Sequence, residues 1–184
     1  MTVTVIGIGN DFRRDDGVGL AVAQAIRHLH PAGARVVTTN GEASTLIDTW
    51  SGSELAVFVD SYLQTHAVDS SRQPGRIRRF TSWPTEHCGH CTSSHGLGIV
   101  EALALGAALD RKPRRVAIYT VEAQDIGFGI GLSPPVAASV SVVVSAIIEE
   151  IVNPAKIPSS NRSRTFAVEY GTSPLCHRSF TPGQ

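Results

Sequence analysis

Short apolar runs alternate along the chain with segments in which apolar residues recur every three to four positions, and this alternation constrains the fold most. The run Leu55–Val59 is apolar throughout, which is typical of a strand buried on both faces of a parallel sheet. Val3–Ile8 and Arg114–Val121 are similar β-rich runs separated by helix-period segments. The order predicts an α/β fold with a mostly parallel sheet flanked by helices.

Length and composition bound the number of domains and the class of partner. The chain has 184 residues, of which 42% are hydrophobic, enough to fill the core of one domain. Its 16 basic side chains balance 16 acidic ones, which argues against a nucleic-acid partner because phosphate binding depends on clustered Lys and Arg. Composition shifts to Pro, Ser, Thr and Arg after Asn153, so we expect a domain over residues 1–153 and a flexible tail over residues 154–184.

Cysteine usage and hydropathy indicate the compartment. The chain has three cysteines, which are too few for a disulfide framework and, being an odd number, cannot all be paired within it. Val3 begins a strand pattern with no signal-peptide features before it. The apolar block Val136–Ile148 is interrupted by serines and is shorter than the roughly 20 residues that span a bilayer. We therefore expect a cytoplasmic protein with no membrane insertion. We also expect it to be a monomer.

The remaining elements follow from periodicity and turn residues. Arg76–Phe80 has the polar alternation of an exposed or edge strand, and its arginines are expected on a solvated face. A further strand is predicted at residues 35–38. Helices are predicted at residues 18–30, 42–50, 95–110 and 136–152.

Polar residues that follow strands mark the candidate site, because open α/β sheets bind ligands beyond the carboxyl ends of their strands. Asp16 begins the helix after the first strand, Asp60 is expected to close the third strand, and His95 opens a later helix. Two carboxylates and an imidazole suit a divalent transition metal with open coordination positions. Each residue also has an ordinary structural interpretation, as a helix cap, a turn acid or a surface histidine.

Two other motifs invite a ligand. Gly7 and Gly9 suggest a nucleotide-binding turn, but the third glycine of a dinucleotide fingerprint is missing and Asp15 and Asp16 would repel phosphate. His87–Cys91 looks like half of a zinc site and lacks a second half within the domain. For that segment a zinc site, a redox or substrate-contact role and a plain loop all stay open.

Five sequence blocks together suggest a family. Their order and spacing resemble those of the hydrogenase maturation endopeptidases, which trim the C-terminus of the large subunit of nickel-iron hydrogenases. The resemblance spans roughly residues 3–152, and it rests on Val5–Asn10, Arg14–Gly19, Val57–Ser61, Ser94–Gly98 and Gly129–Pro134.

The resemblance implies a fold, a metal cluster and a partner. The fold is a three-layer α/β/α sandwich with a twisted, mostly parallel central sheet of the phosphorylase/hydrolase-like type. The cluster that recognises nickel in the family corresponds to Asp16, Asp60 and His95, with Asp16 in place of the Glu that some members carry. The implied partner is a hydrogenase large-subunit precursor, and nickel is the implied metal, either bound to the protein or carried by the substrate. Other divalent metals are expected to be able to take the place of nickel.

The predicted function is an endopeptidase that removes the C-terminal extension of that precursor after nickel loading. The sequence contains no His-Glu-x-x-His motif and no Ser or Cys with an evident paired base, so it identifies no catalytic residue. Asp16 and Asp60 are both candidate proton acceptors. The alternatives are a nickel-sensing chaperone that binds the precursor without cleaving it and, more remotely, a nucleotide-binding oxidoreductase.

Overall fold

The computed structural model describes residues 2–64, 72–82, 91–92, 96–153 and 164–166. The strands are β1 (Val3–Ile8), β2 (Ala34–Thr39), β3 (Leu55–Gln64), β4 (Ile77–Phe80), β5 (Cys91–Thr92), β6 (Arg115–Glu122) and β7 (Arg164–Phe166). The helices are the short 3-10 helix η1 (Arg14–Gly17), α1 (Val18–Leu29), α2 (Ala43–Trp50), α3 (Gly96–Ala108) and α4 (Pro134–Val152).

The strands form one mixed sheet in the order β2-β1-β3-β6-β4-β7, and β5 pairs with the end of β3. β2, β1, β3 and β6 are parallel, whereas β4 runs antiparallel to β6 and β7 runs antiparallel to β4. In the parallel part Val57 lies opposite Val5 on one side and Ala117 on the other. The carboxyl ends of β1, β3 and β6 therefore meet at one edge of the sheet, as the sequence predicts.

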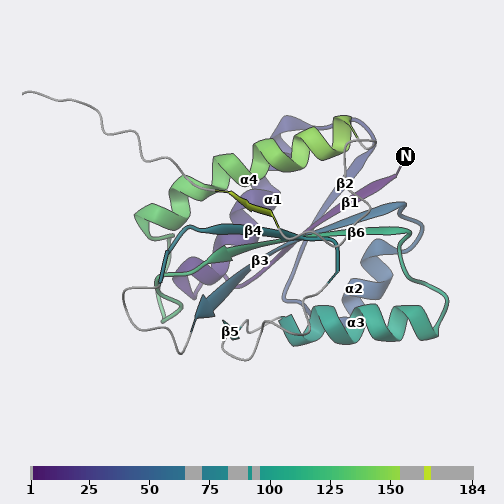
Figure 1. Ribbon diagram of the computed structural model, residues 1–184, viewed down its shortest axis with the longest axis horizontal. Helices are drawn as coiled ribbons and strands as arrows, with labels where there is room; N and C mark the ends of the chain where they lie inside the picture. Colours follow the sequence, from purple (N-terminus) through teal and green to yellow (C-terminus); the bar gives the residue numbers. More distant parts are fainter. Residues whose placement is uncertain (1, 65–71, 83–90, 93–95, 154–163, 167–184) are drawn as a thin grey trace, which may run out of the picture.

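Helices cover both faces of the sheet, with α1 and α4 on one face and α2 and α3 on the other (Figure 1). Residues of β3 alternate between two apolar cores, because successive side chains of a strand point to opposite faces. Val57 and Val59 pack with residues of α1 and α4, while Ala56 and Phe58 pack with residues of α2 and α3. The expected three-layer α/β/α sandwich is confirmed.

Asp60 does not close the third strand, and that sequence expectation is wrong. β3 continues to Gln64 because its parallel pairing with β6 extends through Tyr62, opposite Glu122. Pairing with β1 stops earlier, at Val59. Beyond Val59, η1 contacts β3, and the Ser61 hydroxyl donates a hydrogen bond to Asp16 of η1.

The expectation of an exposed or edge strand at residues 76–80 is also corrected, and so is the expectation that Arg79 is solvated, whereas Arg76 and Arg78 are partly exposed. β4 pairs with β6 on one side and with β7 on the other. Arg79 is only 2% exposed, and its Nε donates a hydrogen bond to Glu150 of α4. Glu150 also accepts a hydrogen bond from the Tyr119 hydroxyl at 2.7 Å. Arg79 thus belongs to a buried network between the sheet and α4.

Three residues of the expected tail form β7, which pairs with β4. The rest of the segment from residue 154 to 184 lies outside the described residues. The boundary at residue 153 therefore stays a prediction.

By length and composition alone, α4 is long and apolar enough to cross a membrane. In this fold, however, Val136, Val143 and Ile147 have no exposed surface and belong to the core beneath α4. Only 28% of the apolar window of α4 is buried, so α4 packs one face against the sheet and leaves the rest of its surface outside the core.

Candidate functional site

The loop after β1 reaches the carboxyl edge of the sheet through three close backbone contacts that only glycine permits. A Cβ on Gly19 would lie 2.2 Å from the Ile8 carbonyl oxygen and 2.4 Å from that of Val59. Gly9 has a φ of +150°, and a Cβ there would lie 1.9 Å from the Asp16 carbonyl oxygen. These glycines bring η1 and the start of α1 directly onto the ends of β1 and β3.

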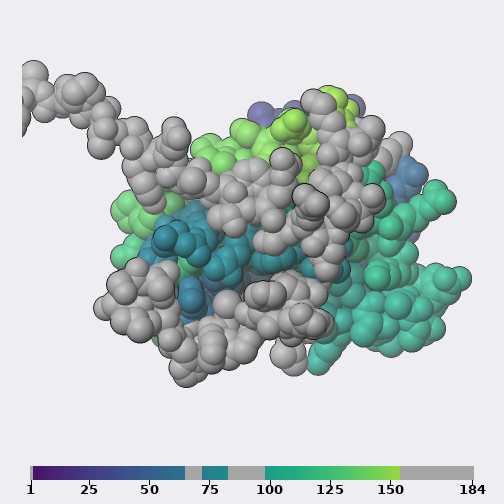
Figure 2. Space-filling view, in the orientation of Figure 1, coloured from purple at the N-terminus to yellow at the C-terminus, as the bar shows by residue number. Residues whose placement is uncertain are grey.

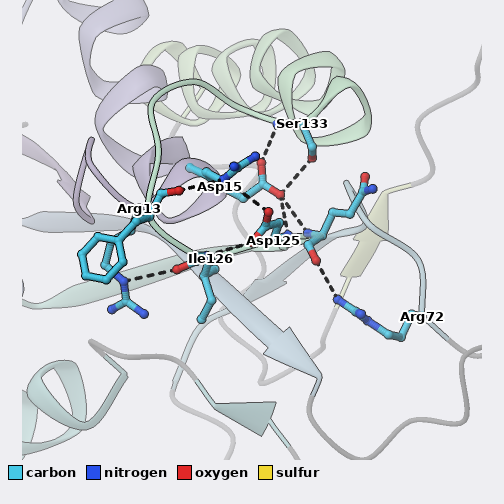
Figure 3. A network of polar contacts seen from close by, with 10 residues as sticks. Arg13, Asp15, Arg72, Asp125, Ile126 and Ser133 are labelled. Atoms are coloured by element: carbon cyan, nitrogen blue, oxygen red, sulfur yellow. Dashed lines mark hydrogen bonds and ion pairs between the residues drawn. The ribbon is translucent and has the colours of Figure 1, made fainter.

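Asp15 is a fully buried carboxylate that holds the loop between β6 and α4 (Figure 3). Its Oδ2 accepts hydrogen bonds from the backbone N–H groups of Gln124 at 2.9 Å and Asp125 at 3.0 Å. Ser133 donates twice, from its backbone N to Oδ1 at 2.6 Å and from its Oγ to Oδ2 at 2.9 Å. Both oxygens of Asp15 are thus occupied, which assigns this residue a structural role.

Asp16, the next residue, points to β3 instead. It is 1% exposed, and its Oδ1 accepts a hydrogen bond from the Ser61 hydroxyl at 3.1 Å. The Ser61 backbone N donates to Oδ1 of Asp60 at 2.8 Å, and Asp60 is fully buried. A single residue, Ser61, therefore links the two predicted carboxylates, which are far apart in the sequence.

Sequence reasoning assigned no role to Ser61. The available signal was its position directly after Asp60 in one of the family-like blocks. Its hydroxyl and its backbone N–H each donate to a different carboxylate, so Ser61 fixes the orientation of both. Hydrogen bonds of this kind set the direction of potential metal ligands.

His95 lies outside the described residues. α3 begins at the following residue, Gly96, and a Cβ on Gly98 would lie 2.1 Å from the carbonyl oxygen of Gly41, in the loop after β2. The first turn of α3 is therefore at the carboxyl edge of the sheet. Within the described ranges, no group of three His, Cys, Asp or Glu side chains is placed to hold a metal ion, and the cluster with His95 stays a prediction.

The oxygen donors of Asp16 and Asp60 fit a divalent ion chemically. Carboxylates at a protected strand edge suit a hard or borderline cation, and one imidazole would add affinity for nickel.

Glu122 is a further buried carboxylate at this edge that sequence reasoning missed. Its Oε2 accepts a hydrogen bond from the Tyr62 hydroxyl at 2.9 Å, and its Oε1 accepts one from the Gln73 backbone N at 2.8 Å. Burial raises the pKa of Tyr62 above its usual range, against the opposing effect of Arg78, whose guanidinium lies 4.9 Å from the Tyr62 ring centroid. The phenol therefore stays protonated and donates to Glu122, which fixes the segment before β4.

The Cys- and His-rich segment 87–91 falls mainly outside the described residues. Cys91 is the first residue of β5 and pairs with Gln64 at the end of β3. The alternatives for this segment stay open.

Comparisons with known proteins identify similar chains. A family model described as hydrogenase maturation protease (HycI) matches residues 57–150. Among solved structures, the NiFe hydrogenase maturation protease HybD from Thermococcus kodakarensis is 25% identical, with a TM-score of 0.64 over 80% of this chain and 97% of that chain.

Two further structures share the fold at lower identity. The hydrogenase maturating endopeptidase HybD from E. coli is 18% identical, with a TM-score of 0.65 over 84% of this chain and 94% of that chain. An endopeptidase from Escherichia coli is 16% identical, with a TM-score of 0.70 over 85% of this chain and 95% of that chain. A search of curated proteins finds no match.

Proposed function

We propose a specific cleavage reaction for this chain, which belongs to the hydrogenase maturation protease family and is a peptidase of hydrogenase processing. In this proposal it removes the C-terminal extension of a nickel-iron hydrogenase large-subunit precursor once nickel has been loaded. The observation that carries the proposal is the pair of buried carboxylates, Asp16 and Asp60, joined by Ser61 at the carboxyl edge of the sheet.

Recognition of the loaded metal is the proposed task of Asp16, Asp60 and His95. The two carboxylates come from η1 and β3, and the position of α3 brings its first turn to the same edge. Because their oxygens are held by Ser61, the carboxylates are preorganised for a cation. A precursor that presents nickel would then bind this edge more tightly than an empty one, so cleavage would follow loading.

The chemistry of cleavage needs a proton acceptor near the attacked peptide bond. Asp16 and Asp60 are the candidates, whereas Asp15 already accepts four hydrogen bonds. A divalent ion bound there would supply Lewis-acid polarisation of water or of a carbonyl oxygen. Ser61 would hold the two carboxylates in place as charge changes during the reaction.

We also propose that the protein acts in the cytoplasm as a monomer, with the precursor as its macromolecular partner and without nucleic acid or membrane insertion. The balance of 16 basic and 16 acidic residues supports the lack of a nucleic-acid partner.

The test is incubation of the purified chain with nickel-loaded and metal-free precursor, followed by intact-mass measurement of the precursor. We expect only the loaded precursor to lose its C-terminal peptide. His95→Ala and Asp16→Asn should cleave at least about 100-fold more slowly, because each removes a ligand or base. Asp11→Asn is the matched control, since Asp11 is an exposed carboxylate on the same loop.

Three results would contradict the proposal: cleavage of both precursors alike, no cleavage of either, or normal rates in the two site variants. Stable binding of the loaded precursor without shortening would favour the nickel-sensing chaperone instead.

A further inference from the structure

Two loops at the carboxyl edge present the three most exposed large apolar side chains among the described residues. Phe128 is 91% exposed, Ile130 84% and Phe12 69%. Phe12 lies in the loop after β1, and the other two lie in the loop between β6 and α4. We call these three residues the apolar rim.

The loops that carry the apolar rim are fixed to each other by backbone hydrogen bonds. The Gly129 N donates to the Phe12 carbonyl oxygen at 3.0 Å, and the Arg14 N donates to the Gly129 carbonyl oxygen at 3.0 Å. The Arg14 side chain adds a bond from its Nε to the Phe128 carbonyl oxygen at 3.1 Å. The backbone that carries these exposed side chains is therefore preorganised, which lowers the backbone entropy lost when a partner covers them.

The apolar rim is also continuous with the candidate site. Asp15 ties the same two loops together through the amides of Gln124, Asp125 and Ser133. Asp16 follows directly, and its backbone N donates to the Arg13 carbonyl oxygen at 3.1 Å. A polypeptide that presents a group to Asp16 and continues along this edge would meet the apolar rim next.

Charge around the apolar rim favours an apolar partner. Arg14 and Asp125 form an ion pair in these loops, with 3.3 Å between the Arg14 Nε and the Asp125 Oδ2, and each side chain is 50% exposed. The two charges offset each other, so they offer little attraction to a polyanion or a polycation. Exposed apolar surface beside a site marks a place where another apolar surface binds.

We propose that the apolar rim docks an apolar segment of the precursor, next to the extension that is removed. This inference rests on the proposed function for the identity of the precursor. Binding at the apolar rim would position the scissile bond at the carboxylates, and it would supply affinity that does not depend on the metal.

The test compares a rim variant with a matched surface variant, both in the full chain. The rim variant carries Phe12→Ser, Phe128→Ser and Ile130→Ser. The control carries Leu105→Ser and Leu109→Ser, which remove exposed apolar side chains from α3 and the residue after it. α3 lies on the outside of the molecule (Figure 2). Precursor binding is followed on an optical biosensor, and KM and kcat are measured for cleavage of nickel-loaded precursor.

We expect the rim variant to bind the precursor at least about 10-fold more weakly and to raise KM to a similar extent, with kcat changed less than about 2-fold. The control should match the wild type. The inference is overturned if the rim variant binds as tightly as the control, or if the wild-type chain does not bind the precursor. Dimers of the wild-type chain that the rim variant abolishes without a change in KM would also overturn it, because the apolar rim would then join two copies.

The binding and cleavage results separate this inference from the proposed function. If the wild-type chain binds the precursor through the apolar rim and does not shorten it, the cleavage proposal fails and the docking surface stands. If cleavage is normal and insensitive to the rim variant, the docking surface fails and the cleavage proposal stands.

Discussion

Replacement of Asp15 by Ala should destabilise the fold strongly, even though the adjacent Asp16 is the candidate site residue. Asp15→Ala removes the acceptor for four hydrogen bonds, three of them from backbone N–H groups. A hydrogen bond to a charged group contributes about 1.5–3 kcal/mol, and losses within one network add incompletely. We therefore expect the free energy of unfolding to fall by about 3–5 kcal/mol, a large share of the roughly 5–15 kcal/mol typical of a domain.

The assay is urea unfolding followed by circular dichroism. With a urea slope of about 2 kcal/mol per molar, the loss lowers the midpoint by about 1.5–2.5 M. Amide hydrogen exchange should accelerate at Gln124, Asp125 and Ser133 in particular, because their acceptor is gone. Asp48→Ala is the control, since the Asp48 side chain is 75% exposed and its ion pair with Arg111 is of the surface kind that contributes about 0–1 kcal/mol. A loss below about 1 kcal/mol for Asp15→Ala, equal to that of the control, would refute the reasoning.

Three further predictions concern packing and buried polar groups. Gly19→Ala should lower the free energy of unfolding by more than about 3 kcal/mol, because its Cβ would overlap two backbone oxygens; an unchanged urea midpoint would contradict the close contact. Glu150→Ala should cost about 3–5 kcal/mol because it leaves Arg79 buried without its charge partner. The combined change Arg79→Met, Glu150→Met and Tyr119→Phe, which also removes the hydroxyl that donates to Glu150, should be nearly neutral; equal losses in both would be inconsistent with a buried ion pair. Burial raises the pKa of the Tyr62 and Tyr119 phenols in the folded protein. As the pH rises past about 10, the phenols of the unfolded chain therefore lose their protons before those of the folded chain. The stabilisation that comes from the two protonated phenols is complete below that pH and decreases above it. An absorbance titration in which both phenols of the folded protein ionise near pH 10 would disprove this.

The pattern of apolar and polar residues along the chain predicted the helices and strands well, because each of these elements depends mainly on residues close together in the sequence. The continuous apolar run at Leu55–Val59 identified a strand covered on both faces, and Val57 and Phe58 do pack into opposite cores. Helix boundaries also follow local chemistry, as at α4, where two prolines occupy the first turn.

The errors came from interactions between distant segments. Asp60 was expected at a strand end because polarity interrupts the apolar run, but pairing with β6 carries the strand to Gln64. Arg79 looked solvated because its neighbours are polar, but Glu150, 71 residues later, provides a buried charge partner. Charge pairing across such distances cannot be read from spacing along the chain.

The candidate site was predicted in part. Strand-end reasoning selected Asp16 and Asp60, and the structure links them through Ser61. The separate role of Asp15 could not be predicted, because its partners lie more than 100 residues away. The third predicted ligand, His95, stays a prediction.

The central claim is that Asp16 and Asp60 act together as one site for cleavage of the loaded precursor. The most direct measurement is a double-mutant cycle on the rate at which nickel-loaded precursor is shortened, with Asp16→Asn, Asp60→Asn and the combined variant. We predict that each single change slows cleavage by at least about 100-fold and that the combined change is no slower than either one, because groups that act as a unit are lost together. A single variant within about 3-fold of the wild-type rate, or losses that multiply in the combined variant, would contradict the claim.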